Sequence, residues 1–360
     1  MDRIASLGAA LGLIVAWPLI AQPVAIAVHP ARPLIERSSC CQFLNFDFVL
    51  TNPGEEPSEL FEIRVTGLDQ VGGVLFTRRL HGQAVMPGIL TIPKRIVPAK
   101  GEIPILNPFH TLDGSLRIAR LDYLFQLRRG DRVDSVAVQV EPKEYRTKTR
   151  LVIPVVGRVL VWDGHEFYAH HRRLDITRFK DTEMKQFDRY AYDLTLVDER
   201  GEVRKQGDSG PTTVFGWQAP IVAPGDGMVI DAEQDVADQL PGMPPFDEAA
   251  VGTDYRKLLG NFVIIDHQNG EYSVMCHMRQ RSLTVKKGDR VRAGQRIGKI
   301  GNSPGGATVA HLHYQLQDGP DPFVSEGLPS SFTGFYRLLG GKRVPVTRGQ
   351  IDTGDIVEGR

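Results

Sequence analysis

The sequence predicts a mainly β protein with an N-terminal β-sandwich and a C-terminal domain built as an antiparallel β-sheet or flattened barrel. Three observations lead to this fold class. Short segments of alternating apolar and polar residues recur between Gly, Pro and Asn turns, no helical period extends beyond about three turns, and a polar run separates two apolar regions. With 360 residues, the chain is long enough for roughly two to three domains.

The first residues are predicted to be a secretory signal peptide over residues 1–27. Arg3 provides the charged start, an apolar stretch follows from about residue 7 to 20, and Ala-Ile-Ala at 25–27 offers a small-x-small cleavage site. Pro18 interrupts this stretch, which is shorter than the roughly 20 residues of a bilayer span, so an uncleaved anchor is the less favoured alternative. We therefore expect a secreted or periplasmic protein with no stable membrane span after cleavage.

Residues 28–142 are predicted to form an accessory β-sandwich. Segments such as 42–50 and 61–65 alternate in polarity and are separated by Asn-Pro-Gly and Gly-Gly turns, which is typical of short strands in a sandwich. The polar run 141–150 lacks the apolar period needed for packing and is the best linker candidate.

Net charge and cysteine content narrow the function classes. Lys plus Arg and Asp plus Glu number 43 each, so no overall field attracts nucleic acid or an anionic membrane, and a nucleic-acid partner is not expected. Export permits disulfides, but Cys40, Cys41 and Cys276 leave at least one thiol unpaired within the chain. Neighbouring strand residues point to opposite faces, so Cys276 is expected to be a buried apolar residue and not a nucleophile paired with His277.

The second domain is predicted over residues 150–335. Residues 234–255 contain several prolines and acids and are expected to be a long loop, whose role as an inhibitory plug is left open. Residues 336–360 are expected to be a loosely held C-terminal tail. The strands of this domain are expected around residues 151–161, 190–197, 221–232, 261–266, 272–278, 283–285 and 295–300.

A His-x-His pair is the most informative feature of the chain. On a strand, His311 and His313 point to the same face, while Leu312, Tyr314 and Leu316 take the opposite, core-facing side. Two imidazoles that share one face suit a metal site, and a catalytic zinc needs about three such protein ligands with one position left open for water. The candidate ligands in the second domain are His165, His170, His171, Asp193, His267, His277, His311 and His313.

Several segments, in this order, resemble the lysostaphin or LytM type of zinc endopeptidase. They are the strand pair around residues 261–278 with Met-Cys-His-Met at its end, a Val-x-x-Gly-Asp-x-Val-x-x-Gly-Gln turn over 285–295, and the Gly-rich loop and His-x-His strand over 301–314. The resemblance is dense over about 215–316 and looser from about 189. It implies a LytM-like domain of the duplicated hybrid type.

The resemblance also implies roles for three histidines. In that family the second histidine of His-x-His binds zinc, which corresponds to His313. The first histidine of the pair and the histidine of a Tyr-x-His-Leu motif are catalytic, and they correspond to His311 and His277, with Met275 in place of the common tyrosine. Their expected roles are to position and deprotonate the zinc-bound water and to stabilise the oxyanion.

The remaining two ligands of the family come from a His-x-x-x-Asp pattern that this chain keeps only in part. Asp193 is present, but Arg189 stands where the histidine belongs. An upstream histidine can restore the missing imidazole, and His171 is ranked slightly ahead of His170, with His165 third. Arg189 is expected to orient Asp193 from outside the ligand set.

The predicted zinc ligands are therefore His171, Asp193 and His313, with His277 and His311 as catalytic groups. Simpler interpretations remain for parts of this set. Asp193 could cap a turn, and the two adjacent histidines at 170–171 could form a solvated basic cluster with the arginines that follow.

The sequence thus predicts a zinc-dependent endopeptidase that hydrolyses peptide bonds through zinc-activated water. As the resemblance implies, the substrate is peptidoglycan, in its cross-links or stem peptides, or a Gly- or Ala-rich peptide that fits a narrow groove. A non-catalytic LytM-like regulator that binds cell wall or activates another hydrolase is the alternative, and a cysteine peptidase using Cys276 is a weaker third. The oligomeric state is left open.

Overall fold

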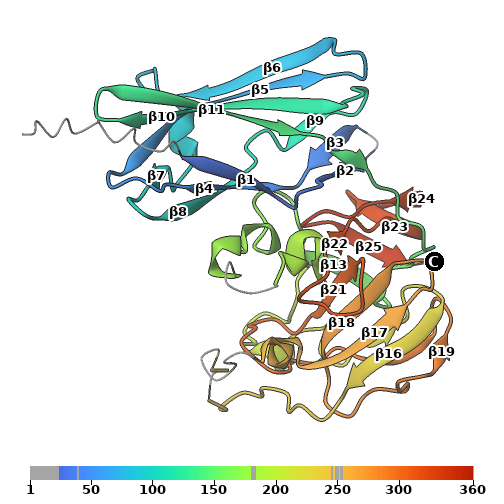
Figure 1. Ribbon diagram of the computed structural model, residues 1–360. Helices are drawn as coiled ribbons and strands as arrows, with labels where there is room; N and C mark the ends of the chain where they lie inside the picture. The colour runs from blue at the N-terminus through green and yellow to red at the C-terminus, as the bar shows by residue number, and fades with distance from the viewer. Residues whose placement is uncertain are drawn as a thin grey trace, which may run out of the picture.

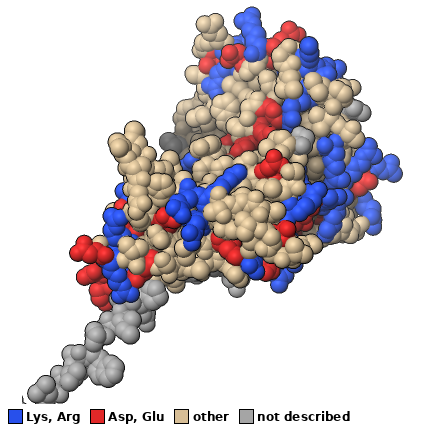
Figure 2. All heavy atoms as spheres, turned by 90° about the horizontal axis from the view of Figure 1, so that it is seen from above, with Lys and Arg blue, Asp and Glu red and all other residues tan. Residues whose placement is uncertain are grey.

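The computed structural model of the protein describes residues 24–38, 40–179, 184–244, 246–247, 251 and 254–359. It confirms a mainly β protein, in which the helical segments of the described residues are short 3₁₀ turns (Figure 1). No helix among these residues has the length and apolar character needed to cross a membrane. Basic and acidic side chains are both present on the face shown in Figure 2, in line with the balanced composition.

The N-terminal part is a sandwich of two antiparallel sheets. The sheets face each other across one apolar core, in which Phe48, Tyr123 and Phe125 pack with their rings 4.8–6.1 Å apart. The first sheet has the order β1 (Ala25–His29), β4 (Asp47–Thr51), β8 (Glu102–Leu106). The second has the order β11 (Arg132–Val140), β10 (Arg120–Arg129), β5 (Ser58–Leu68), β6 (Val74–His81), with β7 (Ile96–Val97) also paired to β5.

A small third sheet lies where the sandwich meets the second domain. Its order is β12 (Lys143–Glu144), β2 (Leu34–Arg37), β3 (Cys41–Leu44), β9 (Thr111–Asp113). Strand β12 belongs to the run predicted as a linker, and just beyond it the backbone N–H groups of Lys148 and Thr149 each donate 2.7 Å hydrogen bonds to the carboxylate of Glu271. The connection is therefore packed against both parts of the protein.

The second part is built on one large antiparallel sheet. Its order is β19 (Arg290–Val291), β16 (Gly227–Glu233), β17 (Asn261–Asp266), β18 (Tyr272–Met278), β21 (Leu312–Gln317), β14 (Tyr192–Leu196), β13 (Arg158–Asp163), β25 (Ile356–Gly359), β23 (Phe332–Leu339), β24 (Lys342–Gly349), with β22 (Gly327–Leu328) also paired to β21. A separate pair joins β15 (Pro220–Val222) to β20 (Arg296–Lys299). Among the described strands the sheet stays open, so the flattened-barrel form of the prediction is not realised.

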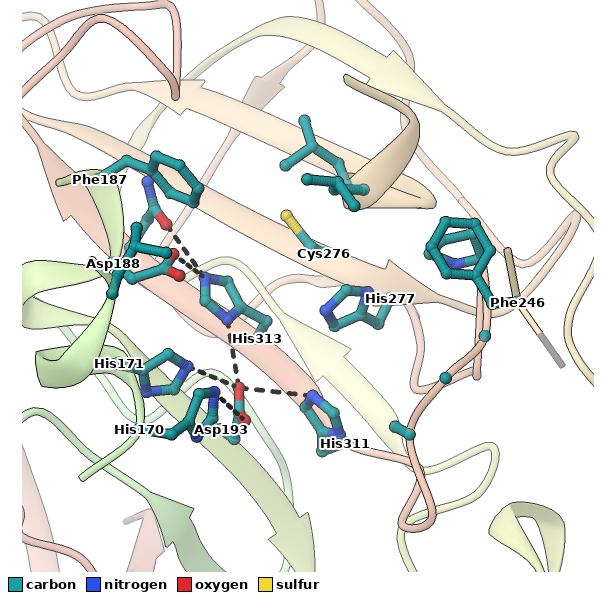
Figure 3. Close-up of a pocket in the computed structure, with 18 of the residues that line it drawn as sticks. His170, His171, Phe187, Asp188, Asp193, Phe246, Cys276, His277, His311 and His313 are labelled. Carbon is teal, nitrogen blue, oxygen red and sulfur yellow. Dashed lines mark hydrogen bonds and ion pairs between the residues drawn. The ribbon is translucent and has the colours of Figure 1, made fainter. Parts of the chain in front are cut away.

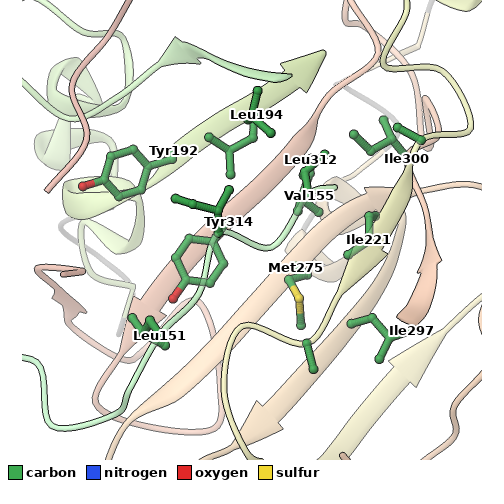
Figure 4. Close-up of a cluster of buried hydrophobic side chains, with 14 of the residues drawn as sticks. Leu151, Val155, Tyr192, Leu194, Ile221, Met275, Ile297, Ile300, Leu312 and Tyr314 are labelled. Carbon is green, nitrogen blue, oxygen red and sulfur yellow. The ribbon is translucent and has the colours of Figure 1, made fainter. Parts of the chain in front are cut away.

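The core of this sheet confirms the side-chain alternation expected from the sequence. Leu312, Tyr314 and Leu316 are fully buried, and they pack with Tyr192 and Leu194 of the neighbouring strand (Figure 4). The opposite face of the same strands is therefore left to the polar residues of the candidate site.

Short 3₁₀ helices replace strands between β13 and β14. These helices carry part of the candidate site, but each is too short to form more than a few backbone hydrogen bonds. The 3₁₀ helices of the described residues are η1 (Gly88–Thr91), η2 (His171–Arg173), η3 (Ile176–Phe179), η4 (Phe187–Tyr190), η5 (Pro211–Thr213) and η7 (Tyr255–Leu259).

The two ends of the chain differ from the expected boundaries. Residues 1–23 of the predicted signal peptide lie outside the described residues, while Val24 is buried in the sandwich core and β1 pairs with β4. A boundary after residue 27 would cut through β1.

At the other end, β23 runs through the predicted domain boundary at residue 335, and β25 pairs with both β13 and β23. The expectation of a loosely held tail is wrong, because Ile351 and Val357 are buried in the main core between the charged residues that suggested a tail.

Candidate metal centre

Three adjacent strands bring the candidate site together. In the register of the sheet, His313 of β21 lies opposite Asp193 of β14 on one side and opposite Cys276 of β18 on the other. Pairing across strands thus makes neighbours of side chains that are far apart in sequence. Figure 3 shows His311 and His313 on the same side of their strand, as the His-x-His spacing predicts.

Asp193 is the centre of the cluster. Its Oδ1 lies 3.2 Å from Nδ1 of His313, 3.4 Å from Nε2 of His171 and 3.4 Å from Nε2 of His311. Burial alone would raise the pKa of Asp193, but these three histidines outweigh it and hold the pKa well below its usual value. The carboxylate is therefore charged and available as a ligand.

The two histidines beside Asp193 are each fixed through their second nitrogen. Nδ1–H of His171 donates to the Gly164 carbonyl at 2.8 Å, which leaves Nε2 facing Asp193. Nε2–H of His313 donates to Oε1 of Gln315 at 3.0 Å, which leaves Nδ1 facing the same carboxylate. Hydrogen bonds of this kind set the tautomer and ring orientation of metal-binding histidines.

The donor atoms of His171, Asp193 and His313 lie within 4.8 Å of one another and could hold a metal ion. Two imidazoles and one carboxylate are the donor set of many catalytic zinc sites. Burial opposes a charge on His313, yet Asp193 and Asp188 outweigh it and raise its pKa to about 9. The electrostatics therefore favour a positive charge between these side chains, and the residues fit a divalent cation.

The other upstream histidines are placed differently. His170 has a side chain that is 66% exposed, contacts Asp163 through Nδ1, and keeps Nε2 4.0 Å from Oδ2 of Asp193. His165 is buried and contacts Glu36 of the sandwich through Nε2 at 2.9 Å, away from the cluster. A second potential ligand group, Asp163 with His170 and His171, shares His171 with the first. Nε2 of His171 lies nearer to the Asp193 carboxylate than Nε2 of His170 does, at 3.4 Å against 4.0 Å.

The guanidinium of Arg189 is directed at Asp47 of the sandwich and not at Asp193. The side chain leaves η4 toward the sandwich, where Nη1 pairs with Oδ2 of Asp47 at 2.8 Å. Arg189, which stands where the resemblance places a histidine, therefore forms a contact between the two parts of the protein.

His277 breaks the alternation of its strand. Its φ is 59°, in the left-handed region, so both Cys276 and His277 line the cavity (Figure 3). The expectation of opposite faces is wrong for this reason. Cys276 is nevertheless buried as expected, and burial raises its thiol pKa well above the usual value, which does not favour a nucleophile.

Both predicted catalytic histidines present Nε2 to the cavity. Nδ1–H of His277 donates to the Ser303 carbonyl at 2.9 Å, and Nδ1–H of His311 donates to the Val309 carbonyl at 2.8 Å. The two ring centroids are 5.2 Å apart. Burial, with the neighbouring His311 and His313, lowers the pKa of His277 to about 3, so its imidazole is neutral near pH 7.

The cluster opens into a cavity of about 920 Å³. One wall is apolar and comes from Phe187, Phe323 and Tyr255, which pack on one another and on the buried strand residues. Phe246 and Val251 of the predicted long loop also line the cavity, so this loop borders the site.

Sequence reasoning did not single out two functional features. Gln315 Nε2 donates to Oε1 of Gln317 at 2.7 Å. The hydrogen bond from His313 to Gln315 is thereby continued along the same face of the strand. Asp188 lies on the cavity with Oδ1 3.6 Å from Nε2 of His313. The signal for the glutamines was available, because the His-x-His spacing continues with period two to Gln315 and Gln317.

Part of the second domain is similar to a known peptidase family. Residues 210–323 match Peptidase family M23. His277, His311 and His313 lie inside the matched range, whereas His171 and Asp193 lie before it.

Two curated proteins of Vibrio cholerae serotype O1 are similar to part of the chain. Peptidoglycan DD-endopeptidase ShyA is 41% identical over 70 residues, which is 19% of this chain and 16% of that protein. Peptidoglycan DD-endopeptidase ShyC is 40% identical over 64 residues, 18% of this chain and 14% of that protein. The similarity thus spans only a small part of the length of these relatives.

Solved structures are also similar at low sequence identity. LytU has a TM-score of 0.25 and 19% identity, with 51% of this chain and 83% of that chain covered. The catalytic domain of lysostaphin from Staphylococcus simulans has a TM-score of 0.21 and 18% identity, with 34% and 88% covered.

Proposed function

We propose that the protein is a zinc-dependent endopeptidase of the bacterial cell wall, secreted or periplasmic, that hydrolyses peptide bonds in peptidoglycan cross-links or stem peptides. The observation that carries this proposal is the convergence of His171, Asp193 and His313 on one point beside two further histidines, all lining one cavity. The match to a peptidase family and the two DD-endopeptidase relatives support it.

His171 Nε2, His313 Nδ1 and the Asp193 carboxylate would hold the ion. A bound zinc ion supplies Lewis acidity, which brings the pKa of a coordinated water near neutrality and polarises the scissile carbonyl. The protein then needs no covalent nucleophile, which agrees with the buried thiol of Cys276.

His277 and His311 would handle the proton. Because the Nδ1–H of each ring is bound to a backbone carbonyl, only Nε2 is free to act on the cavity side. His277, neutral near pH 7, can orient the attacking water by accepting its hydrogen bond and can pass the released proton to the nitrogen of the leaving amine. His311, when its Nε2 carries a second proton beside Asp193, can donate a hydrogen bond to the oxygen of the attacked carbonyl.

The cavity, of about 920 Å³, has room for a short stretch of peptide. Its polar floor carries the histidines and Asp188, and its apolar wall carries Phe187 and Phe323. An extended chain with a scissile bond over the floor would place an adjacent side chain against the apolar wall.

The test is a metal assay and a hydrolysis assay on the full chain and two variants. We expect about one zinc per chain and release of peptide fragments from purified peptidoglycan in the wild type. His171→Ala should lose zinc and activity, and His170→Ala, the matched control, should keep both.

Two outcomes would contradict the proposal. Metal-free protein that stimulates another hydrolase would instead identify a regulator. Hydrolysis that survives chelation but is stopped by thiol alkylation would identify a cysteine peptidase.

A further inference from the structure

One carboxylate of the sandwich is buried between two arginines of the second domain. Asp47 Oδ1 lies 2.5 Å from Nη1 of Arg172, and Asp47 Oδ2 lies 2.8 Å from Nη1 of Arg189. All three residues are 1% exposed. The two guanidinium groups are thus removed from water and share this one carboxylate across the boundary between the two parts of the protein.

Both arginines adjoin the proposed metal ligands. Arg172 directly follows His171 in η2, and Arg189 lies in η4, just before the strand β14 that carries Asp193. The position of each guanidinium therefore limits where the adjoining ligand can lie.

Neighbours of Asp47 bind the same segments through the backbone. Nη2 of Arg172 donates to the Phe46 carbonyl at 2.6 Å, and Nδ2 of Asn45 donates to the Arg189 carbonyl at 2.8 Å. Three consecutive sandwich residues, 45–47, thus contact both ligand-bearing segments.

The ligand-bearing segment has little other regular support. Its described residues between β13 and β14 form short 3₁₀ helices, with bonds such as Gln186 Nε2 to the His171 carbonyl at 2.6 Å. A buried arginine without a partner is strongly unfavourable. Without the carboxylate, the two guanidinium groups would move toward water and displace the adjoining residues, His171 first.

We propose that the N-terminal sandwich is a structural part of the metal centre, and that Asp47 is a positioning residue that sets His171 and Asp193 through Arg172 and Arg189. This inference rests on the proposed function only in taking those two residues as ligands. In this role the sandwich supports the metal centre and does not need to bind a molecule itself.

The sandwich offers a closely matched control. Asp134 also bridges two arginines, with Oδ2 2.6 Å from Nη2 of Arg129 and Oδ1 2.7 Å from Nε of Arg132. These residues lie on the β10–β11 hairpin, which is not one of the elements that carry the proposed ligands. Asp134→Asn therefore removes the same type of charge from the same domain.

The experiment compares full-length wild type, Asp47→Asn and Asp134→Asn. Zinc affinity is measured by competition with a chromophoric chelator, and amide hydrogen exchange of residues 164–179 is measured on metal-free protein. Asp47→Asn should weaken zinc binding about ten- to hundredfold, as for other residues that orient metal ligands, and should speed exchange in 164–179. Asp134→Asn should do neither.

A milder variant covers the case in which Asp47→Asn does not fold. Asn45→Ala removes the bonds to the Arg189 and His165 carbonyls without leaving an unpaired charge, and should weaken zinc binding by a smaller factor in the same assay.

Equal zinc affinity and equal exchange in the Asp47 and Asp134 variants would overturn the proposal. A wild type that binds no zinc would overturn the proposed function instead. The exchange comparison would then decide by itself whether Asp47 positions the segment.

Discussion

The two halves of the candidate metal centre are built in different ways. His313 and His311 come from a central strand of the large sheet, and His277 comes from the strand beside it. His171 comes from a short 3₁₀ helix that is fastened to the other domain through Arg172. These three strand histidines lie inside the family match, whereas His171 and Asp193, the latter on strand β14, lie before it. The comparison teaches that one site can use two sources of positioning. The register of the sheet places some of its side chains, and a buried ion pair places the others.

The largest expected effect is a loss of hydrolysis rate at unchanged zinc content, and it is expected for a variant in the strand half. His277→Ala should lower the rate of peptide hydrolysis by roughly 10²- to 10⁴-fold, because it removes the proposed proton acceptor. Zinc content should stay near that of the wild type, since His277 is outside the ligand set. Steady-state hydrolysis with parallel metal analysis checks this, and a parallel loss of zinc would move His277 into the ligand set.

A smaller effect is expected from the amide that fixes His313. Gln315→Leu removes the acceptor for Nε2–H of His313 and should weaken zinc binding by about 10- to 100-fold. Gln317→Leu, one step further along the strand, should weaken it less. Chelator competition on the two variants would refute this ordering if both behaved as the wild type.

The smallest expected effect concerns the domain boundary and its pH dependence. Burial alone would lower the pKa of His165, but the Glu36 carboxylate outweighs it and the pKa is raised. The pair therefore adds stability that is fully present below the unfolded histidine pKa of about 6.5, and that is lost as pH rises through the folded pKa.

Glu36→Gln tests this sign directly. The variant should be less stable than the wild type at pH 5.5, and the difference should shrink at pH 9, as measured by urea unfolding. A difference that grows with pH would contradict the assignment. Asp134→Asn, whose partners are arginines, should show no such change over this range.

The strand half could be predicted from the sequence because its geometry follows from local rules. The two-residue period of strand residues placed His311 and His313 on one face and Leu312 on the other, and the structure confirms this. The same rule failed at His277. The backbone of this residue is in the left-handed region, so its side chain turns to the same cavity as that of Cys276. Nothing in the local pattern marks that conformation, because it is uncommon for any residue other than glycine, even though histidine adopts it more often than most residues do.

The 3₁₀ half was predicted only by residue type. The structure places Nε2 of His171 3.4 Å from Oδ1 of Asp193, and the reason for this placement lies in contacts that no local pattern shows. Asp47 is read from the sequence as an ordinary strand residue, and its partners Arg172 and Arg189 are more than a hundred residues away. Long-range ion pairs of this kind appear only when the chain is folded.

The shared carboxylate of Asp47 has a consequence for how such a protein can be rearranged. A recombination event that replaced the N-terminal sandwich with an unrelated domain would leave the guanidinium groups of Arg172 and Arg189 without the carboxylate of Asp47. Only a module that supplied an acid at the equivalent place would be compatible. The buried ion pair at the boundary therefore restricts domain exchange, and the two domains of this chain are expected to be inherited together.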